Sequence, residues 1–322
     1  MSNRDDLLKS AKVALEQCMS LKAGEHFLIV TNPELMSMAL ALFEEGQKIT
    51  KETRMVVYPK GKYNGEEPPC WVAEQMFNSD VIIGITVTSI THTHARRRAC
   101  DVFRARVATM PGITEDIFIR GLQADYIKIS ELSHKLLKYF EKAKVARVTT
   151  PYGADFTVEL GNPAEVSDGL CHKPGMVVNL PDGETECAPT NANGVVVANI
   201  SGELITEPTK MVLKDGYIVD IDTSNESGKR FKEFMENAKK VDGNNNAEFI
   251  AEFAMGTNPG AKITGNILED EKVLGTVHVA FGTNTSYPGG TNNSCIHQDV
   301  ILFEPTVWFD DEMVMKDGKL LI

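Results

Sequence analysis

The stretch DVIIGIT, residues 80–86, decides the class of the first part of the chain. It is short, almost wholly apolar and rich in β-branched residues, as expected of a strand that is buried on both faces of a sheet. Comparable strand candidates occur at 26–31, 55–58 and 107–110. Segments with helical spacing lie between them, at 4–21, 35–46, 70–78 and 95–106. Strands that alternate with helices predict an α/β domain with a parallel sheet.

We expect this N-terminal domain to span residues 1–145 and to end with a helix at 130–144. Gly46 is expected to stop the helix that begins at residue 35. The pattern then changes, and residues 146–322 predict an α+β domain that is mainly antiparallel β. Its hairpins at 211–222 and 313–322 each carry an Asp-Gly turn, which supplies the positive φ that a tight turn needs. A strand at 176–181 and helices at 226–240 and 247–255 are also expected in this domain.

The composition excludes several classes of protein. The chain has 322 residues, with 33 Lys and Arg against 45 Asp and Glu, a formal net charge of −12. An acidic chain argues against nucleic acid and anionic membranes as partners. The start of the sequence shows no secretory signal pattern and no apolar run is long enough to cross a bilayer. We therefore expect a cytoplasmic protein whose six cysteines, none in a C-x-x-C pair, are reduced thiols.

Candidate metal ligands gather in the second domain. GTVHVAFG (275–282) alternates so that His278 shares a face with small residues. In SCIHQDVILF (294–303), His297 and Asp299 are two apart and point to one face of a strand. A loop rich in Gly, Asn and Ser joins the two segments. If the strands pair across that loop, they bring His278 close to His297 and Asp299.

Two carboxylates complete the candidate set. Glu252 falls in the expected helix 247–255, on the same helical face as Glu248. Glu184 and Glu186 are alternatives in NLPDGETECAP (179–189), and the local pattern does not choose between them. Imidazoles combined with carboxylates suit one or two divalent ions of Zn, Co, Mn or Fe. A plainer interpretation, which treats each residue as an ordinary core or solvated side chain, is open for every one of them.

The first domain offers a rival site. His92, His94 and the run Arg96–Arg98 follow the strand at 80–86, at the end of the sheet where open α/β folds bind ligands. They predict either an anion site or a helix start with a solvated basic face. Apart from this rival site, His172 lies near the Glu184 segment and could line the metal site, although on pattern alone it is an ordinary loop histidine. The sequence has no G-x-G-x-x-G, Walker A, H-E-x-x-H or G-x-S-x-G motif.

The second domain resembles the thermophilic metalloaminopeptidases of the aminopeptidase T and aminopeptidase S type. The likeness lies in four segments that occur in the family's order, mainly within residues 175–300: NLPDGETECAP, AEFAMGTNP, EKVLGTVHVAFGTN and GGTNNSCIHQD. The resemblance implies a two-domain homodimer with its active site in the second domain. A related and shorter branch resembles 2,5-dihydroxypyridine dioxygenase, which uses one iron held by two histidines and one carboxylate.

The resemblance also assigns residues. It matches the family's metal-binding glutamates to Glu184, in preference to Glu186, and to Glu252. Its other ligands match His278, His297 and Asp299. The family carries a tyrosine shortly after its first ligand histidine, and the nearest one here is Tyr287.

Three functions follow as hypotheses. The first is a metal-dependent aminopeptidase acting on peptides, in which Glu184, Glu252 and Tyr287 take part in catalysis; the presence of both glutamates favours it. The second is a mononuclear iron dioxygenase that acts on a small aromatic substrate through His278, His297 and Asp299. The third is a non-catalytic binder of a small molecule in the first domain.

Overall fold

The computed structural model describes residues 3–161 and 163–322. They form two compact units, one of Met1–Ser130 with Asp168–Asp182 and one of Glu131–Ser167 with Gly183–Ile322. The expected boundary was residue 145. The division instead falls after Ser130, and residues 168–182 belong to the first unit. Among the described residues no helix is long and apolar enough to cross a membrane.

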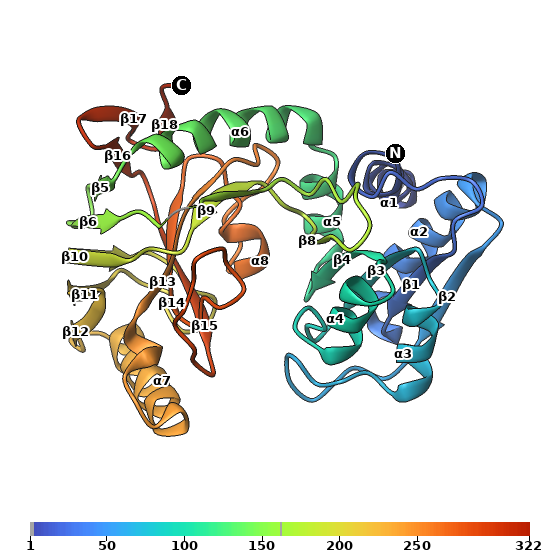
Figure 1. The fold of residues 1–322 in the computed structure, drawn as a ribbon, viewed down its shortest axis with the longest axis horizontal. Coiled ribbons are helices and arrows are strands. Elements are labelled where there is room, and N and C mark those ends of the chain that lie inside the picture. Colours follow the sequence, from blue (N-terminus) through green and yellow to red (C-terminus); the bar gives the residue numbers. More distant parts are fainter. Residues whose placement is uncertain (1–2, 162) are drawn as a thin grey trace. The chain divides into compact units, whose positions relative to one another are not determined.

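Unit 1 is built on a parallel sheet, sheet A, with the strand order β2-β1-β3-β4-β8 (Figure 1). Its strands are β1 (Phe27–Thr31), β2 (Thr53–Val57), β3 (Val81–Thr86), β4 (Arg106–Pro111) and β8 (Val177–Asn179). Its helices are α1 (Asn3–Val13), continued by a π-helical turn at Ala14–Cys18, α2 (Met36–Ile49) after a 3-10 turn at Pro33–Leu35, α3 (Cys70–Phe77), α4 (His94–Asp101), α5 (Glu115–Leu122) and the start of α6 (Tyr126–Lys142).

Both faces of sheet A are covered, which confirms the predicted α/β class. Side chains of β1 alternate between two apolar clusters: Phe27 and Ile29 pack with α1 and α2, whereas Leu28 and Val30 pack with α3 and α4. The strand expected at 176–181 is β8, and it pairs in parallel with β4 in this sheet. Placing that strand in the second domain was therefore wrong.

Gly46 does not end its helix, because α2 continues to Ile49. The expected stop at this residue was wrong. A Cβ on Gly46 would lie 2.8 Å from the Phe27 ring, which is closer than real carbon contacts. The glycine is therefore explained by the close approach of the helix to β1 and not by helix termination.

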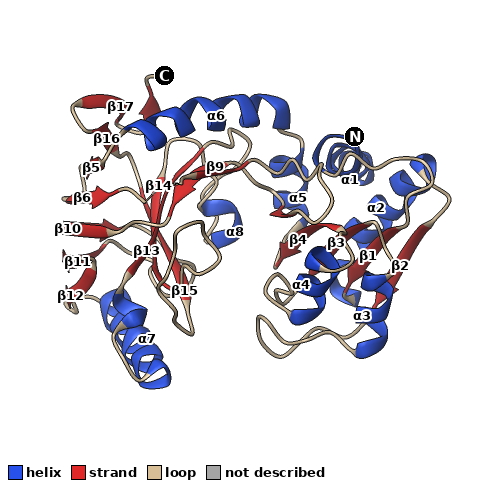
Figure 2. Ribbon diagram, in the orientation of Figure 1, coloured by secondary structure: helices blue, strands red, loops and turns tan. Residues whose placement is uncertain are grey.

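Unit 2 has two further sheets, and Figure 2 shows that strands dominate it. Sheet B has the order β12-β11-β10-β6-β5-β16-β17-β18, and sheet C the order β15-β14-β13-β9-β7. Neighbouring strands in both sheets pair antiparallel, as predicted. The strands of sheet B are β5 (Val145–Thr149), β6 (Asp155–Glu159), β10 (Asn191–Ala198), β11 (Thr209–Lys214), β12 (Tyr217–Ile221), β16 (Thr306–Phe309), β17 (Glu312–Lys316) and β18 (Lys319–Leu320).

Sheet C carries the candidate ligands. Its strands are β7 (Glu165–Ser167), β9 (Glu184–Cys187), β13 (Ile250–Gly256), β14 (Val277–Gly282) and β15 (His297–Leu302). One face of sheet C, including Phe253, Val279 and Val300, packs in the same apolar core as sheet B and the second half of α6. The unit also contains α7 (Glu226–Asp242), a 3-10 turn at Asn246–Glu248 and α8 (Ile267–Asp270).

The helix expected at 247–255 was wrong, because residues 250–256 form β13. Phe249 and Phe253 are four apart, and so are Glu248 and Glu252. A spacing of four places residues on one side of a helix, but it is also a multiple of the strand period of two. Glu252 therefore stands on a central strand of sheet C, and its side chain is 3% exposed.

Candidate metal centre

Strands β14 and β15 bring the histidines together. They pair antiparallel, with Gly282 opposite His297 and Ala280 opposite Asp299. Because residues two apart in a strand point to the same face, His278 lies on this face as well. The pairing across the loop is therefore as predicted.

Strands β13 and β9 extend the same face with carboxylates. Glu252 lies opposite Ala280 on β14, and Glu184 lies opposite Gly256. Glu186, two residues after Glu184, shares the face. We call these six residues the polar face of sheet C: Glu184, Glu186, Glu252, His278, His297 and Asp299. Residues paired with them include Ala254, Gly256, Ala280 and Gly282. At both glycines the backbone packs closely, because a Cβ would lie 2.2 Å from a carbonyl oxygen, that of Val273 or of Ile296.

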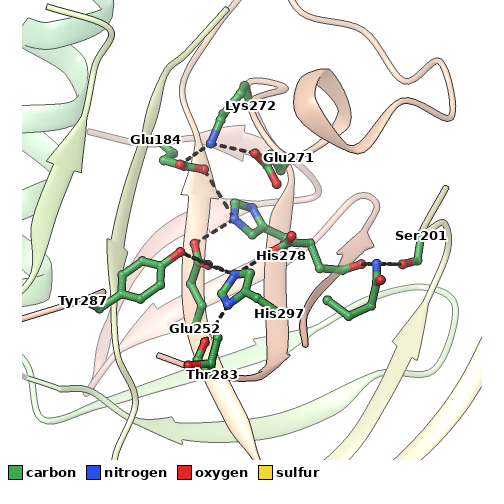
Figure 3. A network of polar contacts seen from close by, with 11 residues as sticks. Glu184, Ser201, Glu252, Glu271, Lys272, His278, Thr283, Tyr287 and His297 are labelled. Atoms are coloured by element: carbon green, nitrogen blue, oxygen red, sulfur yellow. Dashed lines mark hydrogen bonds and ion pairs between the residues drawn. The ribbon is translucent and has the colours of Figure 1, made fainter. Parts of the chain in front are cut away.

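The carboxylate of Glu252 lies between the two imidazoles (Figure 3). Its Oε1 is 3.1 Å from His278 Nε2, and its Oε2 is 3.0 Å from His297 Nε2. His278 Nε2 is also 3.4 Å from Glu184 Oε2, and His297 Nε2 is 3.5 Å from Asp299 Oδ1. The five residues predicted as ligands thus form one chain of contacts through Glu252.

Three groups of side chains in the described chain have ligand atoms within 4.8 Å of one another. We call them trio 1 (Glu184, Glu252, His278), trio 2 (Glu252, His297, Asp299) and trio 3 (Glu271, His278, Asp299). Glu252 belongs to trios 1 and 2, and a carboxylate shared in this way can bridge two ions. Imidazole nitrogens with carboxylate oxygens are donors that Zn, Co, Mn and Fe accept, so the residues fit such ions.

The charges of Glu252, His278 and His297 strongly affect one another's pKa values. Burial opposes the charging of His278, but the hydrogen bond and charge of Glu252 raise its pKa to about 9. Burial likewise opposes charging of His297, and Asp299 and Glu252 raise its pKa well above the usual value. Burial opposes ionisation of Glu252, yet its hydrogen bonds to both histidines hold its pKa well below the usual range. Without a metal, Glu252 is therefore a carboxylate between two imidazolium rings.

His297 is held by its other ring nitrogen. Nδ1 is 2.8 Å from the Thr283 carbonyl oxygen, and a carbonyl only accepts, so Nδ1 donates and Nε2 faces the carboxylates. This arrangement is typical of metal-binding histidines, whose second nitrogen donates to a backbone carbonyl or carboxylate. The Tyr287 hydroxyl donates to Glu252 Oε2 at 2.7 Å, and its ring stacks on His297 with centroids 5.6 Å apart. Tyr287 thus contacts two of the candidate ligands, Glu252 and His297.

The structure adds Glu271 and Lys272, which the sequence did not indicate. The Lys272 ammonium pairs with Glu184 and, at 2.9 Å, with Glu271 Oε1. The lysine side chain is 4% exposed. In the sequence these residues lie in a charged run, EDEK (269–272), and such runs are usually solvated. Only the folded chain shows that this one turns inward.

Glu186 also lies inside the site. It is buried, and burial together with the charge of Glu184 raises its pKa well above the usual range. Unlike Glu184, it belongs to none of the trios formed by the described residues.

The rival site in unit 1 is already filled by the chain. The amides of His94 and Ala95, at the start of α4, both donate to the carboxylate of Glu67. Arg96 is buried and its Nε donates to the Thr91 carbonyl. An external anion at this helix start would have to displace Glu67. His172, which was a candidate to line the metal site, belongs to unit 1 and contacts the Gln17 carbonyl there.

Residues 7–322 match the family described as 2,5-dihydroxypyridine 5,6-dioxygenase. The chain belongs to this family. The match spans nearly the whole sequence and agrees with the resemblance to the aminopeptidase T group and its dioxygenase branch. No curated protein matches the chain.

Two solved structures share the fold. One is a 2,5-dihydroxypyridine dioxygenase from Pseudomonas putida KT2440, with a TM-score of 0.79 and 17% identity over 100% of this chain and 98% of that one. The other is wild-type AmpT from Thermus thermophilus, with a TM-score of 0.72 and 16% identity over 100% of both chains. Identities this low establish the shared fold and leave the reaction open.

Proposed function

We propose that this protein is a metal-dependent aminopeptidase, which hydrolyses N-terminal residues from peptides. The observation that carries the proposal is the position of Glu252, whose two oxygens face different histidines at 3.1 and 3.0 Å. A carboxylate shared between two ligand trios is what a two-metal hydrolase requires. A site for one ion needs a single trio and no such sharing.

Trios 1 and 2 would hold the ions. Divalent ions there would supply an acidified water and an electrophile for the scissile carbonyl. The chain's own groups would handle the protons. Glu184 and Glu252 are buried carboxylates in the site, so either can accept a proton from the attacking water and return it to the leaving amine. The Tyr287 hydroxyl fixes the orientation of Glu252 through its 2.7 Å hydrogen bond.

The test uses the purified full chain, stripped of metal and reloaded separately with Zn²⁺, Co²⁺, Mn²⁺ or Fe²⁺. A panel of aminoacyl chromogenic amides and short peptides reports release of the N-terminal residue. We expect hydrolysis that depends on metal, is lost in His297→Ala and continues without oxygen. A metal-loaded protein that cleaves none of these amides would overturn the proposal.

A second candidate is a mononuclear iron dioxygenase that opens a dihydroxylated nitrogen heteroaromatic ring. Two observations favour it. The first is the family match over residues 7–322. The second is the ion pair of Lys272 with Glu184, because it neutralises a carboxylate that a site for one ion does not need. A single ferrous ion would supply the oxygen chemistry. The ligands expected from the sequence are His278, His297 and Asp299, but these three are not one of the trios of the described chain, whereas trio 2 combines His297 and Asp299 with Glu252. Oxygen uptake that requires both Fe²⁺ and 2,5-dihydroxypyridine would establish this activity, and its absence under those conditions would exclude that substrate.

A further inference from the structure

Lys272 is a positive charge built into the polar centre of unit 2. Its ammonium contacts Glu184 and Glu271, and both the lysine and Glu184 side chains are 4% exposed. A buried ammonium is stable only where anionic partners surround it. In Figure 3 the lysine reaches the site from the Glu184 side, while Tyr287 and Thr283 lie at the His297 side. The two ends of the site are therefore electrically different.

The ammonium pairs with a carboxylate of trio 1 and with a carboxylate of trio 3. Glu184 belongs to trio 1 and Glu271 to trio 3, and each of them pairs with Lys272. Neither of these two glutamates belongs to trio 2, whose members are Glu252, His297 and Asp299. An ion in trio 1 or trio 3 would share a carboxylate with the lysine, whereas an ion in trio 2 would not.

The histidines differ in the same direction. His297 Nδ1 donates to the Thr283 carbonyl, which fixes the ring and strengthens Nε2 as a ligand. Nδ1 of His278 is buried and has no hydrogen-bond partner within the described chain. The His297 side chain is 26% exposed, but that of His278 is 1% exposed. Trio 2 is thus both the better supported and the more accessible position.

We propose that Lys272 makes the metal positions unequal, so that one divalent ion binds tightly at trio 2 and a second binds weakly and exchangeably at trio 1. Repulsion between a buried ammonium and a nearby divalent ion is weakly screened. The inference rests on the metal site of the proposed function but not on its reaction. Such unequal binding would let a centre with ligands for two ions hold only one of them when metal is scarce.

The test is a titration of the metal-free full chain with Co²⁺ alone, monitored by calorimetry and by visible absorption. We expect one tight ion per chain and a second that binds at least about tenfold more weakly, a gap of about 1.4 kcal/mol. His278→Ala should remove the weak step and leave the tight one. His297→Ala should remove the tight step. Two equivalent ions, or loss of the tight step in His278→Ala, would overturn the inference.

Lys272→Met tests the cause. Methionine keeps an unbranched chain of similar length without the charge, so the weak step should tighten by about tenfold or more while the tight step changes by less than about threefold. A weak step that stays as weak, or disappears, would refute the role of the ammonium. The matched control is Lys239→Met, which removes a lysine paired with Glu248 at 2.9 Å outside the trios and should change neither step.

A second variant guards against loss of folding, because Lys272→Met leaves two buried carboxylates without their cation. Lys272→Met combined with Glu271→Gln removes one charge of each sign, and it should also bring the two binding constants closer together. The reaction is tested separately by the peptide assay. Unequal binding without hydrolysis would refute the aminopeptidase and keep this inference, and hydrolysis with two equivalent ions would do the reverse.

Discussion

Replacing Glu252 with glutamine should disable both metal positions at once. The substitution keeps the shape of the side chain and removes one negative charge. That charge lies 3.1 Å from His278 Nε2 and 3.0 Å from His297 Nε2, on a side chain that is 3% exposed. Solvent therefore screens it little, and no other residue belongs to both trio 1 and trio 2 among the described residues.

The size of the effect follows from the charge that is lost. Two unit charges about 4 Å apart interact by about 4 kcal/mol at an effective dielectric constant of about 20. Since about 1.4 kcal/mol corresponds to a factor of ten in Kd, the loss is about 1,000-fold. Glutamine keeps an amide oxygen that can still contact an ion, so we expect each step to weaken by about 100-fold to 1,000-fold.

The assay is calorimetric titration of metal-free protein with Zn²⁺, wild type against Glu252→Gln. The matched control is Glu248→Gln, because Glu248 is four residues away and pairs with Lys239 outside the trios. In a helix the two glutamates would share a face, whereas here only Glu252 enters the site. Wild-type affinity in Glu252→Gln, or an equal loss in Glu248→Gln, would refute the placement of Glu252 on β13 as the shared ligand.

Three other outcomes follow from the same structure. In the metal-free protein the pKa of His278 is about 9, so an ion that binds this ring near pH 7 should release a proton, and its affinity should rise with pH up to about 9. Calorimetry in buffers of different protonation enthalpy measures the number of protons released. Binding without proton release would contradict this pKa. In the folded chain at pH 8, the exposed Cys70 and Cys295 should react with a thiol reagent, whereas Cys171, whose pKa burial raises to about 12, should react only after unfolding; mass spectrometry of the labelled peptides decides. Tyr287→Phe keeps the ring on His297 and removes the hydroxyl bonded to Glu252, so kcat should fall by about tenfold to 100-fold with metal content unchanged, and equal kcat would exclude a catalytic part for the hydroxyl.

The polar face of sheet C was partly predictable because strand alternation is a local signal. The spacing of His297 and Asp299, and the position of His278 among small residues, both depend on a period of two. The loop between the segments then made pairing of the strands the natural expectation. These three residues lie as the alternation indicated.

Other parts were not predictable from local pattern. A spacing of four fits a helix and a strand alike, and this ambiguity placed Glu252 in a helix. Strand β8 resembles its neighbours in the sequence, but its partner β4 is about seventy residues earlier in the chain, so its sheet is decided by tertiary structure. The inward turn of Lys272 depends on burial, which charge alone does not reveal.

The family and the geometry make different statements about the same residues, and Lys272 connects them. The proposed dioxygenase activity, which the family match favours, would need one ion, while the carboxylate of Glu252 between two histidines offers places for two. If the ammonium on Glu184 weakens one position, both statements hold: the ion at trio 2 is the resident one, and the ion at trio 1 depends on conditions. The number of bound ions then distinguishes the two proposed reactions. Amide hydrolysis at a centre bridged by Glu252 needs the second ion, and opening of the aromatic ring does not. Lys272→Met, by favouring the second ion, should therefore raise a peptidase activity at limiting metal and leave an iron-dependent oxygenase activity without benefit.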